Sequence, residues 1–141
     1  MDKTQNKQLI LKNQVEELSR VEGFLDELAA NWSLPLSLML SLNLALEEAI
    51  TNIIFYGYDD EAPHDIVIDF AKTGNILEIK IIDDGHEYDP TARPDPDITL
   101  AAEDRPIGGL GIFLIKKVMD QVDYQRKDNK NQLTLIKRIE K

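Results

Sequence analysis

One segment, residues 35–56, constrains the fold of this chain more than any other. It is apolar at most positions, so it predicts a long helix that is buried on most of its sides. Pro35 suits a first helical turn, and Gly57 is a stop signal at the other end. At about 100° per residue, four polar residues share one stripe roughly 60° wide: Ser37, Ser41, Glu48 and Asn52. This stripe faces either solvent or a polar cavity.

Length and composition narrow the class of protein. The chain has 141 residues and 43% hydrophobic residues, which predicts one domain with one core. No continuous apolar run looks long enough to cross a bilayer, and the first residues lack a secretory signal, so we expect a cytoplasmic protein. Cysteine is absent, which excludes disulfides and thiolate chemistry. The net charge of −10 disfavours general binding to nucleic acids.

Hydrophobic periodicity predicts an α+β sandwich with helices on one face of a mixed sheet. The predicted helices are residues 15–32, 35–56 and 112–122. The predicted strands are residues 9–11, 66–70, 76–83, 122–126 and 133–139, with turns at 73–75 and 128–131. A Rossmann domain is disfavoured because no glycine fingerprint follows the first strand.

The first candidate site lies on the long helix. Glu48 and Asn52 are four residues apart and therefore share a face. The carbonyl oxygen of an asparagine suits a hard cation such as magnesium, and a nearby carboxylate can orient or deprotonate an attacking hydroxyl. The alternative is that both residues mark the solvent side of the helix.

The second candidate site is the end of the strand at residues 76–83. Asp83 continues the core-facing alternation that begins at Leu77, so its carboxylate is expected to point inward. An unpaired inward carboxylate is costly, and the amino group of adenine is a natural hydrogen-bond donor for it. Gly85 allows the backbone to approach the ring or to turn sharply. The alternative is an ordinary Asp-Gly turn.

The third candidate site is the glycine cluster Gly108-Gly109-Leu110-Gly111, which opens a predicted helix. Glycines let the backbone approach a phosphate closely, and the free amides of a helix start favour an anion. The cluster is not a Walker A loop, because no Gly-Lys-Ser/Thr follows it. The stretch before it, from Asp84 onward, lacks periodicity and is long enough to be a lid or binding loop.

In this order the three sites resemble the motifs of the GHKL (Bergerat-fold) ATPases, the group of gyrase, heat-shock chaperone, histidine kinase and mismatch-repair ATPases. Glu48-Ala-Ile-Thr-Asn52 is similar to their N box, Asp83-Asp84-Gly85 to their G1 box and Gly109-Leu110-Gly111 to their G2 box. The resemblance implies one domain over residues 1–141 with an ATP lid at about residues 84–108. One departure is Glu87, which stands where the G1 box commonly has a second glycine.

Within that group, residues 46–52 and 108–115 are similar to the anti-sigma factor/serine-protein kinases. The resemblance implies ATP and Mg²⁺ as cofactors, a STAS-domain anti-sigma antagonist as protein substrate, a sigma factor as a second partner, and a homodimer. It implies Glu48 as the catalytic base and Asn52 as the magnesium ligand. The implied ATP-binding residues are Asn52, Asp83, Gly85, Gly108, Gly109, Leu110 and Gly111.

Three other interpretations use the same motifs. A non-catalytic nucleotide-dependent binding module needs Asn52 and Asp83 but no base. A detached histidine-kinase catalytic domain is disfavoured, because the chain has no helix pair carrying a phosphoacceptor histidine and His64 and His86 lie in loop-like contexts. A structural α+β domain without a ligand would contain all three motifs in this order by chance.

Overall fold

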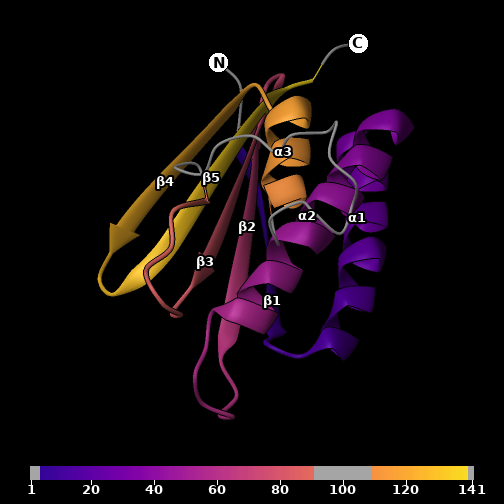
Figure 1. Cartoon of the computed structure of the whole chain (residues 1–141). Coiled ribbons are helices and arrows are strands. Elements are labelled where there is room, and N and C mark those ends of the chain that lie inside the picture. The colour runs from indigo at the N-terminus through magenta and orange to yellow at the C-terminus, as the bar shows by residue number, and fades with distance from the viewer. Residues whose placement is uncertain (1–3, 91–108, 140–141) are drawn as a thin grey trace.

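The computed structural model describes residues 4–90 and 109–139, and the chain forms two layers (Figure 1). A five-stranded sheet makes one layer and the helices cover one of its faces. The strands are β1 (Thr4–Lys12), β2 (Asp65–Thr73), β3 (Ile76–Asp83), β4 (Gln121–Lys127) and β5 (Lys130–Arg138). The helices are the short 3₁₀ helix η1 (Val15–Leu18) and the α-helices α1 (Ser19–Trp32), α2 (Leu36–Tyr56) and α3 (Gly109–Val118). The predicted α+β sandwich is confirmed.

The sheet has the order β1-β2-β3-β5-β4, and all four neighbouring pairs are antiparallel. The prediction of a mixed sheet is therefore wrong. Strands β3 and β4 run in the same direction and are joined through α3, but β5 lies between them and is antiparallel to both. The last hairpin thus folds back into the sheet, which places the start of β5 directly beside the end of β3.

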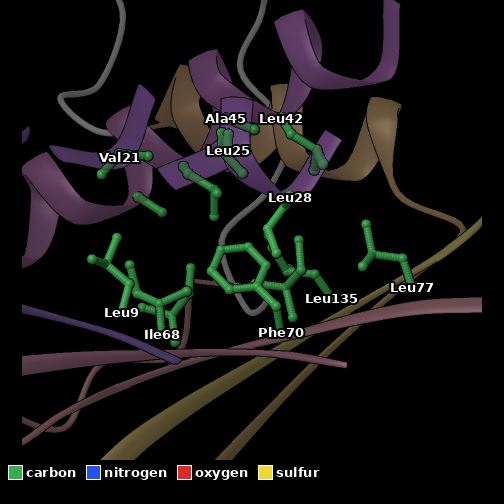
Figure 2. Close-up of a cluster of buried hydrophobic side chains, with 14 of the residues drawn as sticks. Leu9, Val21, Leu25, Leu28, Leu42, Ala45, Ile68, Phe70, Leu77 and Leu135 are labelled. Carbon is green, nitrogen blue, oxygen red and sulfur yellow. The ribbon is translucent and has the colours of Figure 1, made fainter. Parts of the chain in front are cut away.

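The core lies between the sheet and the helices (Figure 2). Helix α1 buries residues three or four apart along one face, as its sequence spacing predicts. From the sheet, Phe70 of β2 is 1% exposed, and its ring lies 5.3 Å from the ring of Phe24 on α1. Alternate residues of β2 and β3 are buried, so one face of each central strand belongs to the core.

Helix α2 is the central helix of the second layer and contacts both α1 and α3. Pro35 lies just before the helix in an extended conformation, and Gly57 caps its end through a hydrogen bond to the carbonyl of Ile53. By length and composition alone, α2 is long and apolar enough to cross a membrane. This corrects the expectation that no such segment exists. In the fold its buried residues instead join the core shared with the sheet.

Several boundaries differ from the sequence predictions, and β1 differs most, because it begins at Thr4 rather than at residue 9. Helix α3 ends at Val118, and Val122 already belongs to β4. The last turn is the pair Asp128-Asn129, with φ of 55° and 62°, as in the two-residue turns that match the twist of a hairpin. Strand β5 therefore begins at Lys130, and Asn131 lies in the strand rather than in the turn.

Candidate active site

A cavity of about 390 Å³ lies between α2, α3, the end of β3, the start of β5 and residues 86–90. It contains two of the residues singled out in the sequence, Asn52 and Asp83. The remaining lining residues are mostly apolar or aromatic, and they include Ile53, Tyr56, Ile81, Tyr88, Ile115, Tyr124 and Leu133. A concave, largely apolar cavity with a few convergent polar groups is typical of small-molecule sites.

Asp83 is the buried carboxylate of this cavity. It is the last residue of β3 and is only 5% exposed, as the strand alternation predicts. The backbone N–H of Gly85 (2.9 Å) and Nδ2 of Asn131 (3.0 Å) both donate to Oδ1 of Asp83. Among the described residues nothing donates to Oδ2. Burial raises the pKa of this carboxyl, and the two hydrogen bonds oppose that rise.

Asn131 lines the cavity and contacts Asp83, although none of the three sequence motifs contains it. It faces Asp83 across the β3–β5 pairing and is 8% exposed. Its Nδ2 also donates to the carbonyl of His86 at 2.6 Å, and its Oδ1 accepts from the hydroxyl of Tyr124 at 2.5 Å. A usable signal was present in the sequence, because Asn131 shares the alternation of the core residue Leu133.

Gly57 and Gly85 lie at a close backbone contact between two segments that line the cavity. The N–H of His86 donates to the carbonyl of Gly57 at 2.8 Å, which joins the end of α2 to the segment after β3. A Cβ atom at Gly85 would lie 2.5 Å from that same carbonyl oxygen. Gly85 therefore makes a close approach that the sequence did not predict, with the backbone of Gly57, and its approach to a nucleotide ring stays a prediction.

Histidine–aspartate pairs also connect the loop after α2 with the segment after β3. His64 contacts Asp60 at 2.7 Å and Asp84 at 3.2 Å, and the two carboxylates raise the pKa of the imidazole. Asp84 directly follows Asp83 in the sequence and is exposed, whereas Asp83 is buried. His86 contacts Asp59 at 3.0 Å. The loop after α2 thus supports the segment that carries Asp83.

Replacing Gly85 with alanine is expected to lower both the melting temperature and the affinity for the cavity ligand. The new Cβ would meet a backbone oxygen, which cannot rotate away, so the Gly57–Gly85 contact must open. Gly23→Ala is the matched control: a Cβ there meets nothing within 4 Å and lies inside α1, so we expect stabilisation of about 0.5–1 kcal/mol. Thermal melts of the two variants test the predicted changes in stability. A Gly85→Ala protein as stable as wild type would contradict the argument.

Among the residues whose side chains the structure describes, only one of the other predicted site residues lies in the lining of the cavity. Asn52 lines it, whereas Glu48, one turn earlier on α2, is exposed and is not part of its lining. Gly109, Leu110 and Gly111 form the first turn of α3, and Gly108 lies outside the described residues, as does most of the predicted lid. Glu87, at the position of the second G1-box glycine, lines the cavity.

The chain belongs to the histidine kinase-like ATPase family, because residues 11–137 match the model of that domain. The match extends from β1 through most of β5, so it includes the whole cavity. The chain therefore belongs to an ATP-using family, and the predicted GHKL membership is confirmed.

Within the family its relatives are serine-protein kinases. The chain is 33% identical over 98 residues to the serine/threonine-protein kinase BtrW of Bordetella bronchiseptica, over 70% of this chain and 69% of BtrW. It is 34% identical over 85 residues to the serine-protein kinase RsbW of Listeria monocytogenes, over 57% of this chain. That match spans only 54% of RsbW, about half its length. These relatives bear out the prediction of a protein kinase of this type.

A solved structure agrees with the fold. The crystal structure of RsbU and RsbW domains from Mycobacterium tuberculosis superposes with a TM-score of 0.69 at 16% identity. It covers 96% of this chain and 32% of the other. At this identity the likeness concerns the fold, and it confirms the predicted Bergerat architecture over nearly the whole chain.

Proposed function

We propose that this chain is an ATP- and Mg²⁺-dependent serine kinase that phosphorylates a STAS-domain anti-sigma antagonist in the cytoplasm. In a partner-switching circuit of this kind, the unphosphorylated antagonist would release a sigma factor held by the kinase. The proposal depends most on one observation: Asp83 is buried and lines a cavity of ligand size, and among the described residues both hydrogen bonds to it go to the same carboxylate oxygen. The relationship to serine-protein kinases supports the same activity.

The geometry at Asp83 favours adenine as the base. Oδ2 of Asp83 has no donor among the described residues, and the 6-amino group of adenine can donate a hydrogen bond to it. Guanine carries a 6-oxo group at that position, so two acceptors would face each other. The apolar lining, including Ile53 and Ile81, suits the faces of a purine ring.

The phosphates are assigned to the start of α3. The amides of Gly109, Leu110 and Gly111 belong to its first turn, where N–H groups lack helical partners and the helix dipole favours an anion. Gly108 and Gly85 are assigned as further backbone contacts to the nucleotide. Lysine residues of α3 lie only in its last turn, so the backbone amides would provide most of the attraction there.

Asn52 is assigned as the magnesium ligand. Among the described residues no group of three or more histidine, aspartate or glutamate side chains could hold a metal ion. This agrees with a magnesium ion that takes one protein oxygen and completes its shell with phosphates and water. The amide of Asn52 lines the cavity and is uncharged, which fits that task. When bound, magnesium neutralises charge on the transferring phosphates.

Glu48 is assigned as the catalytic base. It lies one helical turn from Asn52 on the same face of α2, outside the cavity lining and exposed. A serine of a partner protein must arrive from solvent, so an exposed carboxylate can meet its hydroxyl, whereas Asn52 is half-buried and lines the cavity. The carboxylate would orient the hydroxyl and accept its proton as the phosphoryl group transfers.

The direct test combines binding with transfer. Calorimetry with ATP and Mg²⁺ is expected to show binding, and radiolabelled γ-phosphate is expected to move to a serine of a STAS-domain protein from the same cell. Absence of heat from well-folded protein would refute nucleotide binding altogether. Binding without transfer to any STAS-domain protein of that genome would instead favour a non-catalytic nucleotide-dependent binding module.

A homodimer is part of the same proposal, through apolar residues near the amino terminus such as Ile10 and Val15, which are 44% and 47% exposed. Burial of these side chains against a second copy would support the interface.

A further inference from the structure

We propose that Asn131 is a positioning residue for base recognition, which fixes the carboxylate of Asp83 so that one oxygen alone is presented to the purine. This inference rests on the proposed function and adds a residue that the three motifs do not contain. The inference is argued from the hydrogen bonds of the Asn131 side chain, which is buried and lines the cavity.

All four hydrogen-bonding positions of the Asn131 amide are occupied. Nδ2 donates to Oδ1 of Asp83 (3.0 Å) and to the carbonyl of His86 (2.6 Å). Oδ1 accepts from the hydroxyl of Tyr124 (2.5 Å) and from the backbone N–H of Tyr88 (3.3 Å). An asparagine side chain offers two donor hydrogens and two acceptor lone pairs, so none is left over.

The partners determine which way round the amide lies. The backbone N–H of Tyr88 can only donate, and the carbonyl of His86 can only accept. Flipping the amide would therefore place two acceptors against each other at His86 and two donors against each other at Tyr88. Asn131 consequently presents its N–H₂ group to Asp83, and it cannot exchange this for its oxygen without losing two other hydrogen bonds.

This orientation decides how Asp83 meets a ligand. The backbone N–H of Gly85 and Nδ2 of Asn131 both donate to Oδ1, and together these two hydrogen bonds restrict rotation of the carboxylate. The other oxygen, Oδ2, then has a defined direction and needs a donor from the ligand. Without Asn131 the carboxylate keeps only the contact with Gly85, so it can rotate about its terminal bond and replace the purine donor with water.

The amide of Asn131 also positions residues 86–88, which line the cavity beside Asp83. His86 and Tyr88 line the cavity, and Asn131 binds a backbone group of each. Strand β5 supplies the anchor, because Asn131 is paired directly opposite Asp83 in the sheet. Recognition of the 6-position of the base and placement of residues 86–88 are thus linked through one side chain.

The test measures discrimination rather than affinity alone. Dissociation constants are measured by calorimetry, with Mg²⁺, for ATP and for the triphosphate of purine riboside, which lacks the 6-amino group. We expect wild type to prefer ATP by about 10- to 100-fold, the usual effect of a hydrogen bond between a ligand and a charged group. In Asn131→Leu, which keeps the side-chain shape and removes all polar atoms, we expect the preference to fall to less than about threefold.

Gln132→Leu is the matched control, because it removes an amide from the next residue of β5, on the opposite face of the sheet and outside the cavity. We expect it to keep the wild-type preference. If Asn131→Leu does not fold, Asn131→Ser is measured in its place, and its hydroxyl is too short to reach both Asp83 and Tyr124, so the preference should still fall.

Two contrary results have different meanings. Equal weakening of both nucleotides in the Asn131 variants, with the preference intact, would make Asn131 a purely structural residue and overturn the inference. A wild-type protein that binds both nucleotides equally would instead refute the assignment of Asp83 to the 6-amino group, which belongs to the proposed function.

Discussion

Replacing Glu48 with glutamine is expected to slow phosphoryl transfer to the protein substrate by about 100- to 10,000-fold, the usual contribution of a positioned acid or base. The dissociation constant for ATP should change by less than about threefold, because Glu48 is exposed and does not line the cavity that holds the base. The amide of glutamine keeps the size of the side chain and removes its negative charge together with its ability to accept a proton. Radiolabelled transfer under single-turnover conditions, together with calorimetry, measures the two quantities separately.

The matched control is Glu47→Gln, which makes the same chemical change one residue earlier on α2, about 100° around the helix. It should transfer phosphate at close to the wild-type rate. If Glu48→Gln binds ATP and also transfers at the full rate, Glu48 is not the base. If both variants lose activity equally, the loss comes from removing negative charge on α2 and not from a particular carboxylate.

Replacing Asp83 with asparagine is expected to have opposite effects on binding and on stability. Gly85 and Asn131 both donate to Oδ1, so the oxygen of the new amide must take that place and its N–H₂ must face the ligand. A donor would then oppose the amino group of adenine. We expect ATP affinity to fall by about 100-fold or more, and the ratio of ATP to GTP affinity to fall with it, because the 6-oxo group of guanine can accept from that N–H₂.

The nucleotide-free protein should become more stable at neutral pH in the same variant. Burial raises the pKa of Asp83 in the folded state, so the folded state holds the proton more tightly than the unfolded chain does. This carboxyl therefore stabilises the fold below its ordinary pKa of about 3.8, and that contribution is lost as pH rises through the raised value. Asp83→Asn removes this loss, so its stability should depend less on pH between the ordinary and the raised pKa than that of wild type does.

Urea denaturation at several pH values and calorimetry with ATP and GTP check these expectations. Asp26→Asn is the control, since Asp26 is exposed on α1 and does not line the cavity. An Asp83→Asn protein that binds ATP as tightly as wild type would refute the assignment of the base. A variant that is less stable than wild type would show that the hydrogen bonds to Asp83 contribute more than its burial costs.

Local patterns in the sequence were sufficient for the elements and for part of the site. The apolar run of α2 and its glycine stop signal predicted the helix closely, because backbone hydrogen bonds and periodicity are determined by residues a few positions apart. The alternation along β3 placed Asp83 on the core face for the same reason, and there it is buried. The order of the three motifs indicated a family that residues 11–137 match.

The sequence by itself therefore determined the helices, the strands, the inward direction of Asp83 and the family. Only the tertiary structure decided which strand lies beside β3, and hence that Asn131, 48 positions away, donates to Asp83. It also decided that Gly57 and Gly85 meet and that the histidines pair with aspartates of another segment. These contacts join parts of the chain that are far apart in sequence, and periodicity within one segment carries no information about which distant segment will pack against it.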